Sequence, residues 1–287
     1  MTHKQLELQA EQIREDIIKM LVEAGSGHSA GPLDLTDIFT ALYFQIMNHR
    51  PKQPDWPDRD RLVLSNGHTV PVRYATMARA GYFPVSELAT LRKFGTRLQG
   101  HPERVRLPGL ETTSGPLGSG LSQASGMAYA LRMDGRQSWV YCITGDGELD
   151  EGNIWEAVMF AAKYKLSNLT AIIDRNHIQI DGTTEDVMPL GDLAARFTSF
   201  GWYTIEIDGH NFQAIIDACN LAKTITDHPV AIIAHTIAGK GVDFMERDYH
   251  FHGYFANAPG APDVKEQARI ALHELRTLRG RIRSEHE

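Results

Sequence analysis

The sequence predicts an α/β fold with a mostly parallel sheet and helices on both of its faces. Five or six short apolar runs alternate with segments of helical periodicity, which is the pattern of strands joined by crossover helices. Polar, glycine-containing motifs follow the apolar runs, where an open parallel sheet places its ligand site. No linker or shift in composition divides the chain, so we expect residues 1–287 to form a single domain.

The amino-terminal part of the chain predicts two helices, a connection and a strand. Apolar residues at helical spacing predict a helix over residues 6–23, and a second helix is expected from Asp34 to about Met47. A proline-rich, charged stretch at 48–60 predicts a surface connection. Residues 61–65 predict a short strand, which a further helix follows.

The remainder of the chain continues the same alternation. We expect helices at residues 121–133, 153–165, 192–200, 212–223 and 263–279. We expect strands at residues 139–143, 169–173, 202–207 and 229–234. A polar loop is expected at residues 183–189.

The central strand–helix–strand unit carries polar residues at the carboxyl ends of both strands. Gly145-Asp146-Gly147 follows the first strand, and Asn176 follows the second. Because these ends lie side by side in a parallel sheet, we expect Asp146 and Asn176 to face one small volume. Carboxylate and amide oxygens suit Mg²⁺ or Ca²⁺, and a Mg²⁺ held by few protein oxygens usually shares its shell with a phosphate. The unit therefore predicts a metal site beside a phosphate-bearing ligand.

The same unit resembles the metal motif of thiamine diphosphate enzymes. Alone, the motif could also be a tight turn followed by an Asn cap. The flanking residues are similar to those of transketolases: residues 145–152 read GDGELDEG and residues 174–182 read DRNHIQIDG. The resemblance implies that Asp146, Asn176 and the backbone carbonyl of Ile178 hold the metal, and that Gly145 and Gly147 lie against thiamine diphosphate.

Three loops with a histidine also resemble transketolase loops. A lone loop histidine is usually only solvated, but the neighbours of these residues match the family. The Ser-Gly-His loop implies that His28 reaches the substrate and the reactive carbon. The resemblance places His68 at the cofactor diphosphate. It places His101, in Gly-His-Pro-Glu, against the cofactor and the donor sugar.

Two further segments match the cofactor-ring side of the family's site. The glycine-rich loop at 112–120 implies that Gly115 offers backbone to the aminopyrimidine and that Leu117 supports the bent cofactor. A His-Gly near the thiazolium is matched better by His252 than by His250, and the sequence leaves that choice open. Glu151 resembles an acidic residue at the family's subunit interface, although an exposed helix-dipole role is its simpler explanation.

Composition excludes several function classes. The formal net charge of -7 does not favour nucleic acid or an anionic membrane as a partner, and no apolar run reaches membrane-spanning length. The two cysteines, Cys142 and Cys219, lie in apolar patterns and are expected to be buried thiols. We therefore expect a cytoplasmic protein.

The resemblance covers almost the whole chain, but only the amino-terminal half of an ordinary transketolase. The other half carries the Glu that activates the aminopyrimidine, and no Glu here can be given that role. The resemblance therefore implies the amino-terminal member of a split transketolase. Such a protein forms a heterotetramer with its carboxyl-terminal subunit, and the assembly transfers a ketol unit from a ketose to an aldose.

Two other interpretations stay open at this point. The chain could belong to another thiamine diphosphate enzyme, either a deoxyxylulose-phosphate synthase, whose loop is similar to Gly239-Lys240-Gly241, or a 2-oxoacid dehydrogenase component. It could also be a cofactor-binding module without catalysis of its own. A nucleotide-binding module is disfavoured, because both common glycine-rich nucleotide motifs are missing from the sequence.

Overall fold

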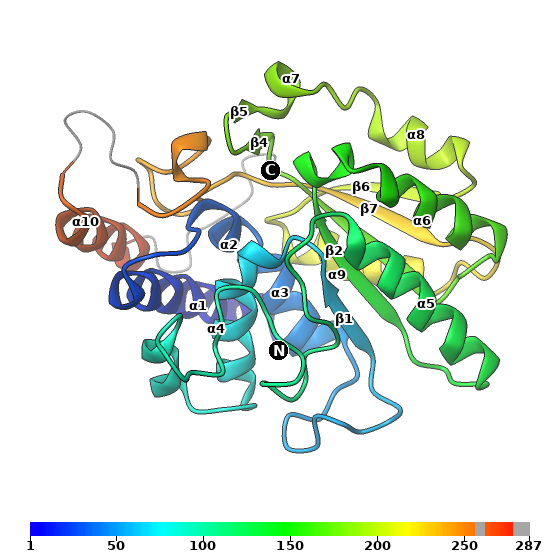
Figure 1. The fold of residues 1–287 in the computed structure, drawn as a ribbon, viewed down its shortest axis with the longest axis horizontal. Helices are drawn as coiled ribbons and strands as arrows, with labels where there is room; N and C mark the ends of the chain where they lie inside the picture. Colours follow the sequence, from blue (N-terminus) through cyan, green and yellow to red (C-terminus); the bar gives the residue numbers. More distant parts are fainter. Residues whose placement is uncertain (256–261, 278–287) are drawn as a thin grey trace.

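The computed structural model describes residues 1–255 and 262–277. Five parallel strands form one sheet in the order β1-β2-β3-β7-β6 (Figure 1). The strands are β1 (Arg61–Leu64), β2 (Val140–Gly145), β3 (Leu169–Arg175), β6 (Tyr203–Asp208) and β7 (Val230–His235). The predicted fold class is confirmed, and each strand lies within two residues of its expected position.

Both faces of the inner strands β2, β3 and β7 are buried, which explains why these strands read as largely apolar runs. In β2, Tyr141 and Ile143 belong to one buried cluster, whereas Val140 and Cys142 belong to a second cluster on the opposite face. Successive side chains of a strand point to opposite faces, so a strand between the two clusters carries apolar residues on both of its faces.

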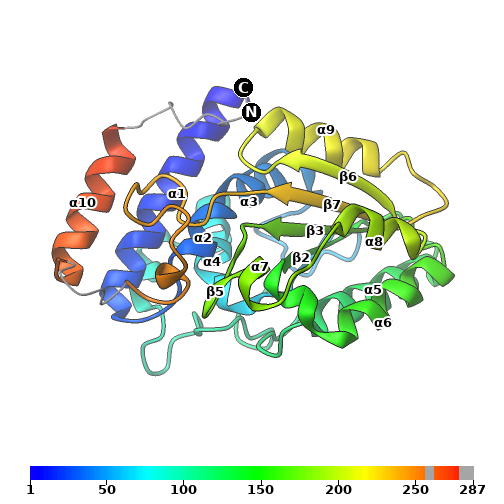
Figure 2. The same cartoon turned by 90° about the horizontal axis from the view of Figure 1, so that it is seen from above.

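Helices cover the two faces unequally. Three of them, α5, α6 and α8, lie on one side of the sheet, and α9 and α3 lie on the other (Figure 2). Helices α1 and α10 lie side by side beyond α3 (Figures 1 and 2). The bounds are α1 (His3–Ala24), α3 (Thr36–Ala41), α4 (Val70–Ala80), α5 (Ser119–Met133), α6 (Gly152–Lys163), α8 (Leu193–Ser199), α9 (Phe212–Ala222) and α10 (Val264–Thr277). The last two residues expected for α10, 278 and 279, lie outside the described residues.

The start that we expected for the second helix, Asp34, is wrong. Instead of one helix from Asp34, the chain forms α2 (Ala30–Asp34), then α3, then a π-helical turn, η1 (Leu42–Ile46). The glycine and proline at the start of α2 suggest a loop, but a proline is tolerated in the first turn of a helix. Asp34 therefore ends a helix, and its side chain is completely buried.

The segment after β3 also differs from the expected polar loop. A two-stranded antiparallel hairpin, β4 (Ile178–Gln179) with β5 (Gly182–Thr183), leads into the short helix α7 (Thr184–Val187). The Thr183 side chain caps α7 by accepting from the backbone N–H of Asp186 at 3.2 Å. Such a side-chain cap replaces a missing helical partner, and polarity alone does not reveal it.

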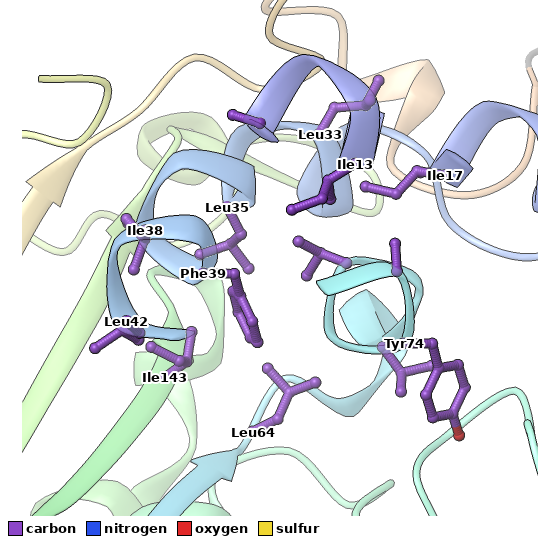
Figure 3. Close-up of a cluster of buried hydrophobic side chains, with 14 of the residues drawn as sticks. Ile13, Ile17, Leu33, Leu35, Ile38, Phe39, Leu42, Leu64, Tyr74 and Ile143 are labelled. Carbon is purple, nitrogen blue, oxygen red and sulfur yellow. The ribbon is translucent and has the colours of Figure 1, made fainter. Parts of the chain in front are cut away.

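A cluster of large apolar side chains fixes the amino-terminal helices against the sheet. Phe39 of α3 points toward Leu64 of β1, and Leu42 lies beside Ile143 of β2 (Figure 3). A buried ion pair supports the same layer, because Arg14 of α1 donates to both oxygens of Asp37 at 3.0 and 2.6 Å. These contacts fix α1 and α3 to each other and α3 to the sheet.

No helix in the described ranges combines the length and the apolar character that crossing a bilayer requires.

Candidate functional site

A cavity of about 260 Å³ opens at the carboxyl edge of the sheet. It is formed where β1, β2 and β3 end, together with loops that are distant in the sequence. The predicted site residues that line it are His28, His68, His101, Gly115, Leu117, Gly145, Asp146, Gly147, Asn176, Ile178 and His252. The structure therefore brings all but one of the predicted site residues to one place.

A larger hollow, of about 580 Å³, lies beyond the ends of β6 and β7. It contains none of the predicted residues; Glu206 and His235, which line it, pair with each other at 2.8 Å. We take the smaller cavity as the site, because polar groups from many separate segments converge on it and their pKa values are strongly shifted.

Three of the predicted histidines form a cluster on one wall of the cavity. The ring centroids of His28 and His68 lie 4.8 Å apart, those of His68 and His252 lie 5.1 Å apart, and those of His28 and His252 lie 5.7 Å apart. His28 follows α1, whose last residue, Ala24, is followed by the capping residue Gly25 in the left-handed conformation with φ 67°. The chain reversal at that glycine turns the Ser26–His28 loop back over the sheet edge.

Burial keeps this cluster uncharged. It lowers the pKa of His28 to about 4, with further lowering from the nearby His252, Arg92 and His101. Burial also lowers the pKa of His68 well below its ordinary range, and the pKa of His252 is lowered for the same reason. The buried Nδ1 of His28 has no hydrogen-bond partner in the described structure. Neutral imidazoles of this kind can accept or donate a hydrogen bond to a hydroxyl-rich ligand.

The predicted metal ligands lie together because β2 and β3 end level. Gly145 pairs with Asp174 in the register, so Asp146 and Asn176 emerge side by side. One oxygen of Asp146 accepts from the backbone N–H of Gly147 at 2.7 Å, and the other from that of His177 at 2.8 Å. No cluster of three or more acidic, histidine or cysteine side chains in the described ranges could hold a metal by itself. A metal here would depend on Asp146, amide and carbonyl oxygens, and its phosphate ligand.

The charges around this point suit a bound cation. Burial raises the pKa of Asp146 to about 6, and burial together with the charge of Asp146 raises the pKa of Asp174 to about 8. Burial and the charge of Asp174 also raise the pKa of Asp34 well above its ordinary range. Three carboxyl groups thus compete for little positive charge. The residues present therefore fit Mg²⁺ or Ca²⁺.

Arg175 is the positively charged residue that pairs with Asp146 in the described structure. Its guanidinium donates to Asp146 at 3.0 Å, to Thr184 at 2.8 Å and to Glu185 at 2.5 Å. It thereby ties the hairpin and α7 to the Asp146 carboxylate, a predicted metal ligand. Sequence reasoning missed this residue, because an arginine at the end of a strand gives no indication of its partners.

Glu148 was also missed, although it lies next to the predicted motif. Its buried carboxylate accepts from the hydroxyl of Ser65, from the backbone N–H of Gly118 at 2.5 Å and from that of Gly145 at 3.1 Å. It therefore joins the end of β1, the end of β2 and the glycine-rich loop that carries Gly115 and Leu117. We name these three contacts the Glu148 clasp.

Two other positions qualify the predicted set. Glu151 does not line the cavity: it is exposed at the start of α6, packed against Gly118. Asn66 does line it, and its buried Oδ1 has no partner in the described structure. An unsatisfied buried acceptor is costly, which indicates a ligand or water at this wall. The roles of all these residues remain predictions.

A parallel sheet whose carboxyl edge carries the predicted metal ligands beside a histidine-lined cavity is the arrangement expected of a thiamine diphosphate-binding domain. Comparison with known families agrees, because the model described as "Transketolase, thiamine diphosphate binding domain" matches residues 6–274. The chain therefore belongs to the transketolase family, and it corresponds to the amino-terminal, cofactor-binding domain of transketolases.

Relatives and solved structures support this membership. The chain is 41% identical over 273 residues to one of the subunits of the apulose-4-phosphate transketolase of Phocaeicola vulgatus, covering 95% of this chain and 96% of the relative. It is 44% identical over 248 residues to the 6-deoxy-6-sulfo-D-fructose transketolase subunit SqwG of Clostridium sp., covering 86% and 90%.

The fold is that of complete transketolases over part of their length. The solved transketolase of Campylobacter jejuni is 30% identical with a TM-score of 0.84, and the match covers 98% of this chain and 48% of that one. The chain thus spans about half the length of that enzyme but nearly all of the two subunit proteins.

We expect Asp146→Ala and Asn176→Ala each to abolish metal-dependent binding of thiamine diphosphate. Each change removes an oxygen from the point where the two strands end, and the described ranges contain no group of three or more acidic, histidine or cysteine side chains that could hold the metal instead. Calorimetry with cofactor and Mg²⁺ measures the effect. Unchanged affinity in both variants would rule out the metal site.

We expect the His28 imidazole to titrate with a midpoint near 4 in an NMR titration of the folded protein. Its ordinary value is 6.5, so between these two values the unfolded chain binds more protons than the folded chain. Folding stability should therefore fall as the pH is lowered from 6.5 toward 4, and His28→Gln should make this fall less steep. A midpoint near 6.5 in the folded protein would contradict the expected desolvation.

Proposed function

We propose that this chain is the amino-terminal subunit of a split transketolase. It transfers a two-carbon ketol unit from a ketose donor to an aldose acceptor, using thiamine diphosphate and Mg²⁺ or Ca²⁺. The observation that carries the proposal is the cavity, in which metal-ligand oxygens and four histidines converge in a chain of the transketolase family. We place the reaction in the cytoplasm, because both cysteines are buried free thiols.

The residues of this chain have two kinds of role in the proposed reaction. Bound thiamine diphosphate supplies an electron sink for carbon–carbon bond cleavage. Asp146, Asn176 and the carbonyl of Ile178 hold the metal, and Gly145 and Gly147 let the backbone approach the diphosphate. His68 lies at the diphosphate, and Gly115 and Leu117 lie against the rings. Glu151 is exposed and does not line the cavity, so we place it at the subunit interface, from where it would influence the bound cofactor indirectly.

The remaining histidines face the sugar in this proposal. His28, His101 and His252 form hydrogen bonds with the hydroxyl groups of the sugar and transfer protons to and from them. Their lowered pKa values support this role, since a neutral imidazole serves as acceptor at neutral pH. The ring centroids of His28 and His252 lie 5.7 Å apart, so the two residues can contact neighbouring hydroxyl groups of one sugar molecule. Of His250 and His252, between which the sequence leaves the choice open, it is His252 that lines the cavity.

An acidic sugar is the substrate class that we favour. The two subunit relatives are named for 6-deoxy-6-sulfo-D-fructose and apulose-4-phosphate, and both names describe acidic sugars. Arg92 lines a hollow that shares His101 with the cavity, and the described structure shows no acidic partner for its guanidinium. An anionic group of the sugar would satisfy this cation.

A partner chain is required for two reasons. Glu148 is the one glutamate among the described cavity residues, and its carboxylate is already held by the Glu148 clasp. In addition, α5 and α6, with Tyr164 directly after α6, expose Tyr129, Met159, Phe160 and Tyr164, and the three aromatic rings contact one another. A contiguous apolar face of this kind favours association. We propose that the partner is a carboxyl-terminal transketolase subunit, and that the assembly is a heterotetramer.

The alternative enzyme classes lose their main support. The Gly239-Lys240-Gly241 loop, which is similar to that of the synthase, does not line the cavity, and Lys240 is buried near Glu246 at 3.8 Å. A non-catalytic cofactor module remains the contrasting hypothesis for the experiment that follows.

We expect the purified chain to have no ketol transferase activity alone and to gain it on mixing with the carboxyl-terminal subunit. The reason is that no glutamate of the described cavity is free to activate the aminopyrimidine. Each chain and the mixture should be assayed with acidic and neutral ketoses, with light scattering to give the assembly. Full activity of the lone chain would contradict the split arrangement, and silence of the mixture would favour the non-catalytic module.

We expect His28→Ala and His252→Ala to leave cofactor affinity nearly intact and to lower kcat/KM by about 10²–10⁴-fold, the usual range for acid–base groups. Both residues lie in the histidine cluster, and neither is among the residues proposed to hold the metal. Steady-state kinetics of the two-chain enzyme measures the loss, and His250→Ala, on the exposed neighbour, is the control. Normal kcat/KM in both cluster variants would remove the proposed role.

A further inference from the structure

The amide group of Asn176 is held by two buried carboxyl groups. Its Nδ2 donates to Asp34 at 3.0 Å and to Asp174 at 3.1 Å. Its Oδ1 accepts from the backbone N–H of Ile178 at 3.1 Å. Both hydrogens of the amide are therefore used by carboxyl oxygens, one from α2 and one from β3.

This arrangement determines which way the amide points. A rotation of the amide by half a turn would set its oxygen against the oxygens of two carboxyl groups, and such contacts are repulsive. The oxygen is therefore directed away from Asp34 and Asp174. Since Asn176 lines the cavity, its oxygen is the atom available to a cation there.

The two carboxyl groups differ in what else holds them. Asp174 accepts a hydrogen bond from the Thr236 hydroxyl and lies within β3. Asp34 is completely buried, one of its oxygens has no partner, and the described residues show no lysine or arginine paired with it. A buried carboxyl group without a cation normally destabilises a fold. The position of Asp34 behind Asn176 therefore needs an explanation other than stability.

We propose that Asp34 is a positioning residue for the metal ligand Asn176, fixing the amide so that its oxygen faces the metal. The inference rests on the proposed metal site and extends it to a residue 142 positions away in the sequence. Partners behind metal ligands orient them, and their loss typically weakens metal affinity by about 10–100-fold.

The test is Asp34→Asn in the two-chain enzyme stripped of metal. With thiamine diphosphate present at a fixed concentration, a calorimetric Mg²⁺ titration should show affinity lower by about 10–100-fold. The unfolding midpoint of the metal-free chain should stay the same or rise, because the change removes a buried carboxyl group without a cation. Weaker metal binding without a loss of stability is expected only if Asp34 serves the metal rather than the fold.

Thr36→Val is the matched control. Thr36 is equally buried, lies two residues away and donates to the Pro32 carbonyl at 2.8 Å, so its loss should leave Mg²⁺ affinity unchanged. Mg²⁺ affinity of Asp34→Asn within about twofold of the unaltered enzyme overturns the inference. A weakened affinity accompanied by a lower metal-free midpoint also overturns it, since Asp34 would then be structural. Failure of the unaltered two-chain enzyme to bind the cofactor at all would instead contradict the proposed function.

Discussion

The parallel pairing of β2 with β3 is the constraint on which the site depends. The register sets Gly145 opposite Asp174, so the two strands end at the same level. Without that register, Asp146 and Asn176 would point into different parts of the structure. The two buried clusters enforce it, because a slip of one residue would move every side chain of β2 to the wrong face. The chemistry at the sheet edge is therefore fixed by the packing of the sheet interior.

Desolvation is the second physical effect that shapes the site. The same burial that lowers the pKa of His28 raises the pKa of Asp146, because it penalises whichever form is charged. The cavity thus combines carboxyl groups, whose charged form a bound cation would stabilise, with imidazoles that burial keeps neutral. The metal-bound diphosphate and the hydroxyl groups of the proposed ligands match these two kinds of group.

Sequence reasoning succeeded where the chemistry follows from local pattern. Asp146 and Asn176 each follow an apolar run, and the geometry of parallel sheets brings such positions together. It could not reach Asp34, whose partner Asn176 is 142 residues away and whose helix was expected to begin, not end, at that residue. Arg175 and Glu148 were missed for the same reason. Their partners come from other segments, which only the folded chain brings near.

The Glu148 clasp affects the free energy of cofactor binding. The clasp joins the ends of β1 and β2 to the glycine-rich loop through hydrogen bonds of the protein alone. Glycine-rich loops lose more conformational entropy on ordering than other segments. Here that loss belongs to the folding of the chain, so it does not recur with each binding event. The loop that carries Gly115 and Leu117 is thereby preorganised, so a ligand that contacts it does not bear the cost of ordering it.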